Sequence, residues 1–304
     1  MATAPPFGQG LRAALACARV SGVKGGERME HLRDGLEDVS PSGWDGHHLL
    51  VADVEEARPA MAAWAEAGLR RGEKMIYAAD ARHPCVERLV ASLATSGVDV
   101  APAADEGQLA VVDTARFYSA PGYEELVVEA LGRGYRGVRS YGGPHAAADV
   151  LGPAEFEGFE RMLERMWTTR AVTAVCCYEP MMVAGAGELD QAVGRHSSGW
   201  SGHLVHAHTP DAGRLCLAGE IDVSNDDLLS AVLAAATRGA GAELIVDCAE
   251  LGYMSVSGWR AALFATQPFR ERGGRVRLVA LTTTMARALQ MIGLAEVFDL
   301  EPSS

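Results

Sequence analysis

Short apolar runs alternate with amphipathic stretches over residues 47–179. The runs read HHLLVA, KMIYAAD, GQLAVVD, GVRSYG and AVTAVCCYE. Between them, apolar residues recur at three- and four-residue spacing, which indicates helices with one buried face. Strands that are apolar on both faces and alternate with such helices are typical of a parallel sheet covered by helices. The pattern predicts an α/β fold built from βαβ units.

Glycine and proline mark where several of these helices end or begin. The first helix turns an apolar face inward, made of Ala57, Met61, Trp64, Ala65 and Gly68. Gly72 follows it as the expected C′ residue. Pro84 and Pro153 each stand in the first turn of a further helix. Another helix is expected from about 122 to 131.

The pattern changes near Trp200, after a stretch rich in glycine and serine. The segment HLVHAHTPDAGRLCLAGEID predicts two strands joined by the turn PDAG. A helix follows, with Ser224 and Asn225 as its expected caps. The runs AELIVDCAEL and RVRLVAL predict two more strands, separated by a helix that opens near Ser255. The helix in TTTMARALQMIGL follows, and AEVFDL ends this pattern. This is the pattern of a small α/β domain.

The chain of 304 residues is longer than one compact core usually uses. We expect a flexible tail over residues 1–43, which are rich in Gly, Ala, Pro and charge. Residues 44–199 form the first predicted domain, and residues 200–304 form the second.

The bulk properties exclude several classes of partner. The formal net charge of -13 argues against a nucleic-acid surface, which needs basic residues. No apolar run reaches the ~18 residues of a membrane span, and no secretory signal is visible. The six cysteines show no CxxC spacing, which favours free thiols in a reducing compartment. A cytoplasmic protein without nucleic-acid or membrane partners is expected.

Sequence motifs of catalysis are absent. The chain contains no GxxxxGK[ST] loop, no GxGxxG after a strand and no GxSxG turn. A serine, histidine and aspartate triad cannot be recognised from spacing, because its members lie far apart in sequence. We therefore expect no catalytic residues, no cofactor and no enzyme activity.

Two clusters raise the question of a metal site. His203, His206 and His208 follow the spacing HxxHxH, and the last two share one face of a strand. No cysteine or carboxylate joins them at ligand spacing, so an exposed edge strand is the favoured interpretation. Cys176 and Cys177 point to opposite faces of their strand and cannot chelate one ion together. We expect buried thiols there and no metal.

The stretch LGYMSVSGWRAAL predicts a buried strand, a tight turn and a helix that opens on Ser255 and Ser257. Hydroxyl side chains at this place commonly cap a helix. The free N–H groups of a helix N-terminus also stabilise a phosphate. Capping and phosphorylation both remain open.

Residues from about 204 to 300 resemble the STAS domain. The matching segments are LCLAGEID, LIVDCAELGYMSVSGWRAAL, GGRVRLVAL and MARALQMIGLAEVFDL, in the family's order and spacing. The resemblance implies a small mixed sheet flanked by helices, and protein–protein signalling as an anti-sigma factor antagonist. The implied partner is an anti-sigma factor or a switch-type serine kinase.

In the STAS family the turn before this helix often reads Asp-Ser-Ser-Gly, and a partner kinase phosphorylates the first serine. Here Val256, which cannot accept a phosphate, stands at that position. The phosphorylation candidates become Ser257 and Ser255, and the alternative is capping with constitutive docking. Asp222 matches a family aspartate near the turn, or is only a turn-forming residue. The expected docking residues are Asp222, Ser255, Val256, Ser257, Gly258 and Trp259.

Residues from about 44 to 198 resemble the MEDS sensory domain. The segments HHLLVADVEEA, GLRRGEKMIYAAD, GQLAVVDTARFY, GYRGVRSYG and AVTAVCCYE carry the resemblance, with His196 near the end. It implies a RecA/KaiC-like parallel sheet that has lost its nucleotide-binding loop and senses a small organic ligand. The segment GPHAA departs from the family pattern and puts a pocket there in doubt.

Parallel sheets place ligands beyond the C-terminal ends of their strands. The resulting pocket candidates are Asp80, Tyr141, His145, Tyr178 and His48. His48 begins its strand, so its alternative role is that of a hydrogen-bonded residue at a sheet end.

These observations predict a two-domain signalling regulator, with a MEDS-like input domain coupled to a STAS output domain. The first alternative is a degenerate RecA-like enzyme that still binds nucleotide. The second is a ligand-free scaffold of a stress-signalling complex.

Overall fold

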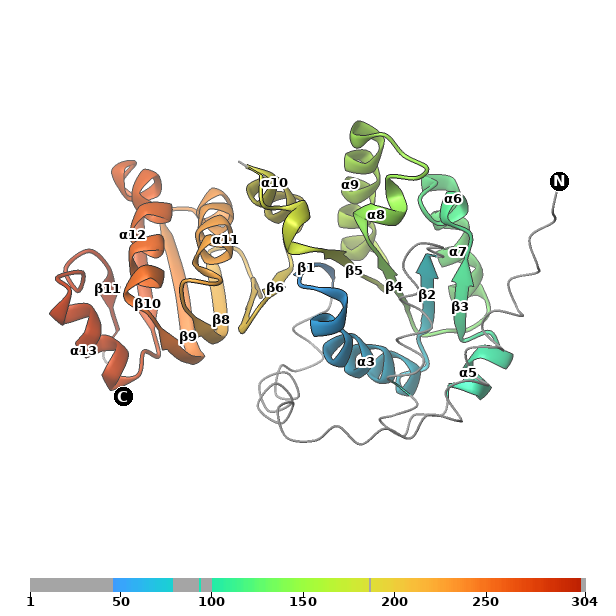
Figure 1. Ribbon diagram of the computed structural model, residues 1–304, viewed down its shortest axis with the longest axis horizontal. Helices are drawn as coiled ribbons and strands as arrows, with labels where there is room; N and C mark the ends of the chain where they lie inside the picture. Colours follow the sequence, from blue (N-terminus) through green and yellow to red (C-terminus); the bar gives the residue numbers. More distant parts are fainter. Residues whose placement is uncertain (1–45, 79–92, 94–99, 186, 302–304) are drawn as a thin grey trace. The chain divides into compact units, whose positions relative to one another are not determined.

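The structure is a computed structural model that describes residues 46–78, 93, 100–185 and 187–301 (Figure 1). The chain divides into two compact units. The first unit is Met1–His47 with Asp53–Cys177, and the second is His48–Ala52 with Tyr178–Ser304. The tail expected at 1–43 and the helix expected at Pro84 lie outside the described residues.

The sheet of the first unit is parallel. Its strands are β2 (Lys74–Ala78), β3 (Leu109–Val112), β4 (Val138–Gly142) and β5 (Val172–Tyr178). They follow the order β5-β4-β2-β3, and each neighbouring pair is parallel. The predicted βαβ architecture is confirmed.

Helices cover both faces of this sheet (Figure 1). They are α3 (Val54–Arg70), α5 (Ala101–Asp105), α6 (Thr114–Phe117), α7 (Ala120–Gly132), α8 (Pro144–Ala147) and α9 (Pro153–Thr169). Helix α3 lies on one side of the sheet, and α8 and α9 lie on the other. As expected, α9 begins at Pro153, and Gly72 follows α3 with a φ of +73°.

A buried arginine of the sheet contacts α3. Arg139 of β4 pairs with Glu73 and donates to the Trp64 carbonyl at 3.0 Å. Its guanidinium lies 5.1 Å from the centre of the Trp64 ring. Gly68 makes room for this side chain, because a Cβ at Gly68 would lie 2.6 Å from the Cδ atom of Arg139. The arginine is therefore balanced in charge and enclosed.

The sheet of the second unit is mixed. Its strands are β1 (His47–Val51, of which His47 itself is counted with the first unit), β6 (Gly199–Gly202), β7 (Val205–His208), β8 (Arg214–Ile221), β9 (Glu243–Met254), β10 (Arg275–Val279) and β11 (Asp299–Leu300). Their order is β11-β10-β9-β8-β7-β6-β1. The β6–β7 and β7–β8 pairs are antiparallel, and the other pairs are parallel.

Amphipathic helices provide the core of this unit. They are α10 (Glu188–Arg195), α11 (Asp226–Gly239), α12 (Val256–Glu271) and α13 (Thr283–Met291), with a short 3-10 turn, η2 (Pro180–Met182). Helix α11 packs against α12 and β8. Its expected inward face is confirmed, since Leu228, Leu229, Val232 and Leu233 are all buried. Burial of these apolar faces is the main stabilising contribution.

Two sequence-based expectations about this unit are wrong. The side chain of Asn225 does not cap α11, because it accepts from the Asp222 amide at 2.9 Å and donates to the Glu220 carbonyl at 2.9 Å. Strand β7, which carries His206 and His208, is not an edge strand. It lies between β6 and β8, so its backbone groups are paired on both sides.

Among the described residues, no helix combines the length and the apolar character needed to cross a bilayer.

Candidate functional site

A small aromatic cavity lies in the first unit, near the C-terminal ends of β4 and β5. Its lining residues are Phe117, Tyr118, Ser140, Gly142, Gly143, Phe156, Phe159, Leu163, Ala174, Val175 and Cys176. It has room for about one water molecule. Ser140 and Cys176 provide polar groups in an otherwise mostly apolar lining. The Ser140 hydroxyl is already held 2.6 Å from the Tyr123 hydroxyl.

The expected pocket residues lie around this cavity rather than in it. Tyr141 and His145 flank the lining residues Gly142 and Gly143, but they are not among the lining residues themselves. The Tyr141 ring instead packs 5.7 Å from the Tyr77 ring. Asp80 lies outside the described residues.

Tyr178 and His48 belong to the second unit. The Tyr178 ring meets the ring of His196 edge-on, with 6.3 Å between ring centres. The Nδ1 atom of His196 lies 2.8 Å from the Ala192 carbonyl. The role of these residues in a ligand pocket stays a prediction.

His48 takes part in a buried histidine cluster of the second unit. Its Nε2 atom lies 2.9 Å from Ser201 Oγ, which lies 2.8 Å from His206 Nδ1. The rings of His48, His206 and His208 stack in series, with 5.5 Å between neighbouring centres. Gly199 leaves space for His48, because a Cβ there would lie 2.5 Å from its Nδ1 atom. These contacts support the hydrogen-bonded role for His48.

His206 is uncharged at neutral pH. Burial lowers the pKa of His206 to about 3, and the neighbouring His208 contributes to the same shift. His206 and His208 share one face of β7, as expected. They do not form a group of three metal ligands with any described residue.

The cavity also touches a thiol that is in contact with a histidine. The Sγ atom of Cys176 lies 3.4 Å from His47 Nε2, and His47 Nδ1 lies 3.0 Å from a Glu164 carboxylate oxygen. A chain of thiol, imidazole and carboxylate is one that can activate a cysteine nucleophile. Here burial raises the pKa of Cys176 well above its usual value, and Glu160 adds to the rise. The thiol is therefore protonated at neutral pH.

The four described cysteines form no disulfide bonds. Cys176, Cys177 and Cys248 are buried, and Cys216 is half-buried. Burial raises the pKa of Cys248 to about 12. The expectation that the cysteines form no disulfide is confirmed for these four residues.

In the second unit, Ser255 caps α12. Its Oγ accepts a hydrogen bond from the Gly258 amide at 3.1 Å, and its own amide donates to the Ile221 carbonyl at 2.8 Å. The hydroxyl of Ser257 lies 2.8 Å from that of Ser255. The capping interpretation is confirmed for Ser255, and Ser257 is the hydroxyl that is not used as a cap.

Exposed apolar side chains lie around this helix start. Val223, Tyr253 and Val256 are 79%, 51% and 57% exposed. Val223 follows the end of β8 and Val256 follows the end of β9, and these strands are parallel neighbours with Ile221 opposite Met254. Asp222 and these three residues therefore lie at or just beyond the C-terminal ends of two neighbouring strands. We call Asp222, Val223, Tyr253 and Val256 the α12 patch.

Two expected docking residues are buried instead. Trp259 is 1% exposed and packs in the core of the second unit. A Cβ at Gly258 would lie 2.7 Å from Ile221 Cγ2, so Gly258 brings α12 close to β8. Both residues help pack α12 against the rest of the second unit, and their part in docking stays a prediction.

Asp222 forms a local turn. Its Oδ1 accepts from the Ser224 amide at 2.7 Å and from the Ser224 hydroxyl at 2.6 Å. These bonds to Ser224 lower the pKa of Asp222 below its usual value. The turn-forming role is confirmed, and it keeps a negative charge beside Val223.

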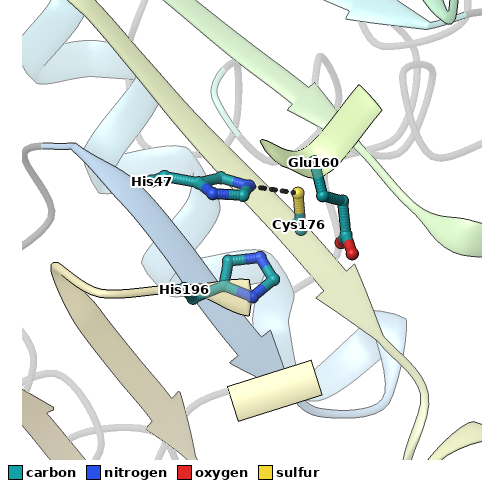
Figure 2. Close-up of side chains that lie close together, drawn as sticks. All are labelled: His47, Glu160, Cys176 and His196. Carbon is teal, nitrogen blue, oxygen red and sulfur yellow. Dashed lines mark hydrogen bonds between the residues drawn. The ribbon is translucent and has the colours of Figure 1, made fainter. Parts of the chain in front are cut away.

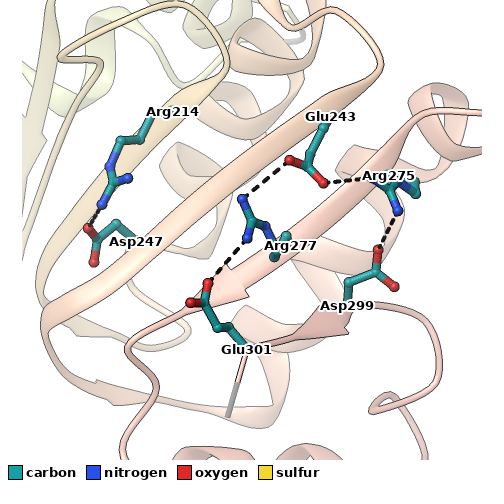
Figure 3. Close-up of polar contacts among 7 residues, drawn as sticks. All are labelled: Arg214, Glu243, Asp247, Arg275, Arg277, Asp299 and Glu301. Atoms are coloured by element: carbon teal, nitrogen blue, oxygen red, sulfur yellow. Dashed lines mark hydrogen bonds and ion pairs between the residues drawn. The ribbon is translucent and has the colours of Figure 1, made fainter. Parts of the chain in front are cut away.

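Ion pairs occupy the opposite end of β9 (Figure 3). Glu243 pairs with Arg275 at 3.0 Å and with Arg277 at 3.3 Å, and Arg277 also reaches Glu301 at 3.3 Å. A separate pair joins Arg214 to Asp247. Exposed pairs of this kind contribute little to stability. They make this part of the sheet polar, in contrast to the α12 patch.

Two known domain families match the chain, one in each half. Residues 47–197 match the model of the MEDS family, described as the methanogen/methylotroph, DcmR sensory domain. Residues 204–301 match a model described as Mlab, STAS domain. Among curated proteins, no sequence matches the chain.

Solved structures resemble the chain over one third of its length. The anti-sigma factor antagonist SpoIIAA is 18% identical in its unphosphorylated form, with a TM-score of 0.27, and covers 33% of this chain and 89% of its own. The phosphorylated form from Bacillus is 20% identical, with a TM-score of 0.27 and coverages of 33% and 92%. A putative anti-sigma factor antagonist from Thermotoga maritima is 13% identical, with a TM-score of 0.28 and coverages of 33% and 88%.

The two family matches account for most of the described residues, in the order and class of fold that the sequence indicates. Residues 47–197 thus match the MEDS sensory domain and residues 204–301 match a STAS domain, and this combination supports a signalling regulator.

Proposed function

We propose that this protein is a non-catalytic anti-sigma factor antagonist whose STAS domain docks on an anti-sigma factor or a switch-type serine kinase. The observation that carries this proposal is the α12 patch. Large apolar side chains exposed at one edge of a sheet are typical of a protein-binding surface. Asp222 adds a negative charge, which favours a partner with a basic rim.

The side chain at position 256 suggests how docking is regulated. Val256 is exposed where the STAS family commonly has its phosphoacceptor serine, so this position cannot be switched off by phosphate. Ser255 is engaged as the helix cap. Constitutive docking is therefore the main proposal, and Ser257 is the secondary candidate for phosphorylation at the helix N-terminus.

The MEDS domain is proposed to sense a small organic ligand in the aromatic cavity. The lining of Phe117, Tyr118, Phe156 and Phe159 suits an apolar molecule. Because the cavity holds only about one water molecule, a larger ligand must displace some of these side chains. Such a displacement is the proposed input signal. The proposed domain limits are 44–199 for this input domain and 200–304 for the output domain.

The connection after β1 argues against a nucleotide-binding enzyme. Only Ala52 and Asp53 separate β1 from α3. A phosphate-binding loop needs glycines there, so that backbone N–H groups can surround the phosphate. Asp53, at the N-cap position of α3, carries a negative charge that repels an anion. A thermal shift with ATP and magnesium tests this alternative, and stabilisation by ATP would favour it.

Affinity capture from the native host tests the docking proposal. The full chain is used as bait, beside the variant Val256→Asp and the control Phe264→Ser. Phe264 is 58% exposed on the same helix, two turns away from the α12 patch. We expect a protein with an anti-sigma factor or serine kinase domain to bind the wild type and Phe264→Ser, and to be lost with Val256→Asp. Equal recovery with all three baits would contradict the proposal.

Val256→Ser tests the regulatory part. The captured kinase and ATP should phosphorylate this variant, because the helix N-terminus is retained and the acceptor is restored. Mass spectrometry of the peptide that contains positions 255–257 locates the phosphate. Phosphate on Ser257 of the wild-type chain would instead show that the switch has moved by one residue.

A further inference from the structure

Three metal-binding side chain types meet inside the first unit. His47 stands at the start of β1, Cys176 lies on β5 and Glu160 lies on α9. The Ala174 amide donates to the Gly46 carbonyl at 2.7 Å, which holds His47 beside β5. Figure 2 shows the three side chains close together, although they come from elements far apart in the sequence.

The distances among them suit a metal ion. One ligand atom from each of His47, Glu160 and Cys176 lies within 4.8 Å of the others. The Nε2 atom of His47 is 3.4 Å from the sulfur of Cys176. Around tetrahedral zinc, a Zn–N bond of about 2.0 Å and a Zn–S bond of about 2.3 Å place nitrogen and sulfur roughly 3.5 Å apart. An ion therefore fits between these two atoms with little movement.

We propose that His47, Glu160 and Cys176 bind a zinc ion. Nitrogen, sulfur and oxygen donors together are the ligand set that zinc accepts in proteins, whereas magnesium and calcium prefer oxygen alone. Zinc in proteins is almost always bound in a tetrahedral arrangement, and these three side chains fill three of its four positions.

The surroundings of His47 provide an independent argument. Its Nδ1 atom donates to the Glu164 carboxylate at 3.0 Å, so Nε2 carries the lone pair that faces Cys176. The other Glu164 oxygen accepts from the indole N–H of Trp167 at 3.2 Å, which fixes the carboxylate in place. A carboxylate that orients the histidine in this way is a regular feature of zinc sites.

Burial and the neighbouring cavity fit the same site. His47 and Glu160 are both 0% exposed, so water does not compete for the ligand atoms. A zinc ion balances the carboxylate and the thiolate, either of which is costly to bury alone. Cys176 also lines the cavity with room for about one water molecule.

Cobalt substitution of the full-length chain tests the proposal. The protein is stripped of metal with a chelator and titrated with Co²⁺, followed by Zn²⁺. We expect one Co²⁺ per chain, with a thiolate-to-cobalt charge-transfer band in the near ultraviolet that Zn²⁺ abolishes. This band is lost in Cys176→Ser. It is retained in the matched control Cys177→Ser, because Cys177 is the next residue of β5 and is buried to the same 7%.

A positioning variant adds a readout that a purely structural role would not change. Glu164→Gln should retain the stoichiometry of one ion and lower the zinc affinity about 10–100-fold, as is typical of residues that orient a ligand. Competition with a chromophoric chelator measures this change. Circular dichroism establishes that each variant is folded.

The absence of a charge-transfer band in the wild-type chain would overturn the proposal, whether or not the variants fold. A band that survives Cys176→Ser would do the same. So would zinc binding that is lost with His206→Gln and His208→Gln, because the ion would then lie on β7 of the second unit. The proposal does not depend on the signalling function, and capture of a partner can fail without affecting it.

Discussion

Ser255 shows how one hydroxyl specifies the start of a helix. Its Oγ accepts the Gly258 amide, whereas no amide donates to Ser257 among the described contacts. We expect Ser255→Ala to lower the free energy of unfolding of the STAS domain by about 1 kcal/mol, within the usual range for a lost cap. Ser257→Ala should cost less. Urea denaturation compares the two, and an equal loss would mean that Ser255 is not the main cap.

His206 makes the second unit sensitive to acid. In the unfolded chain, a histidine takes up a proton near its ordinary pKa of about 6.5. In the fold, burial lowers the pKa of His206 to about 3. Between these values the unfolded state binds more protons, so the stability that is present above about pH 6.5 declines as the pH falls towards about 3.

The slope from this one residue approaches about 1.4 kcal/mol per pH unit. Urea unfolding at a series of pH values measures it, and His206→Gln should make the profile flatter. A profile with an unchanged slope in that variant would assign the acid sensitivity to other groups.

At single residues, sequence patterns predict local chemistry better than long-range chemistry. The cap at Ser255 and the turn at Asp222 follow from neighbours within three positions. The contact between His47 and Cys176 joins residues separated by 129 positions, and spacing rules do not reach that far. One signal was available, because Glu160 and Glu164 interrupt the inward face that Phe156, Phe159 and Leu163 form on α9.

At the scale of elements, α12 depends on a close approach to β8. A Cβ at Gly258 would lie 2.7 Å from Ile221 Cγ2 and 2.9 Å from Met254 Cγ. We expect Gly258→Ala to destabilise the fold by about 1–3 kcal/mol through overpacking. The matched control is Gly239→Ala at the end of α11, where nothing lies within 4 Å of the added Cβ. The control should be neutral or slightly stabilising in thermal unfolding, because alanine favours helix. Similar melting curves for the two variants would contradict the close packing of α12.

Strands and helices could be predicted because each carries its own period. The five apolar runs of the first half became β1 to β5, and the predicted strands β7 to β10 were also found. The pairing of strands was less visible. Strand β7 was expected at an edge, yet β6 and β8 pair with it on both sides. The four residues of β7 do not indicate that a strand pairs on each side. The second neighbour, β6, comes from the glycine-rich stretch before β7, which carries no strand pattern of its own.

At the scale of the whole molecule, the sequence predicts two domains, and the structure divides the chain into two compact units. The second unit includes His48–Ala52, because β1 pairs with β6. A strand from the start of the MEDS match is thus counted with the unit that contains the STAS domain.

We predict that the first domain changes the affinity of the second domain for its partner. We expect the partner identified by affinity capture to bind the full chain and the fragment 200–304 with affinities that differ by at least about fivefold, the lower end of typical allosteric coupling. Circular dichroism must first establish that the fragment is folded, because it lacks β1 and α10.

A second comparison of partner affinity stays within the full chain. Phe156→Trp fills the aromatic cavity and should shift the affinity for the partner in the same direction as a bound ligand. Phe264→Ser is the control, since it lies outside both the cavity and the α12 patch. Calorimetry measures all four affinities, and values that agree within error would mean that the MEDS domain does not regulate docking.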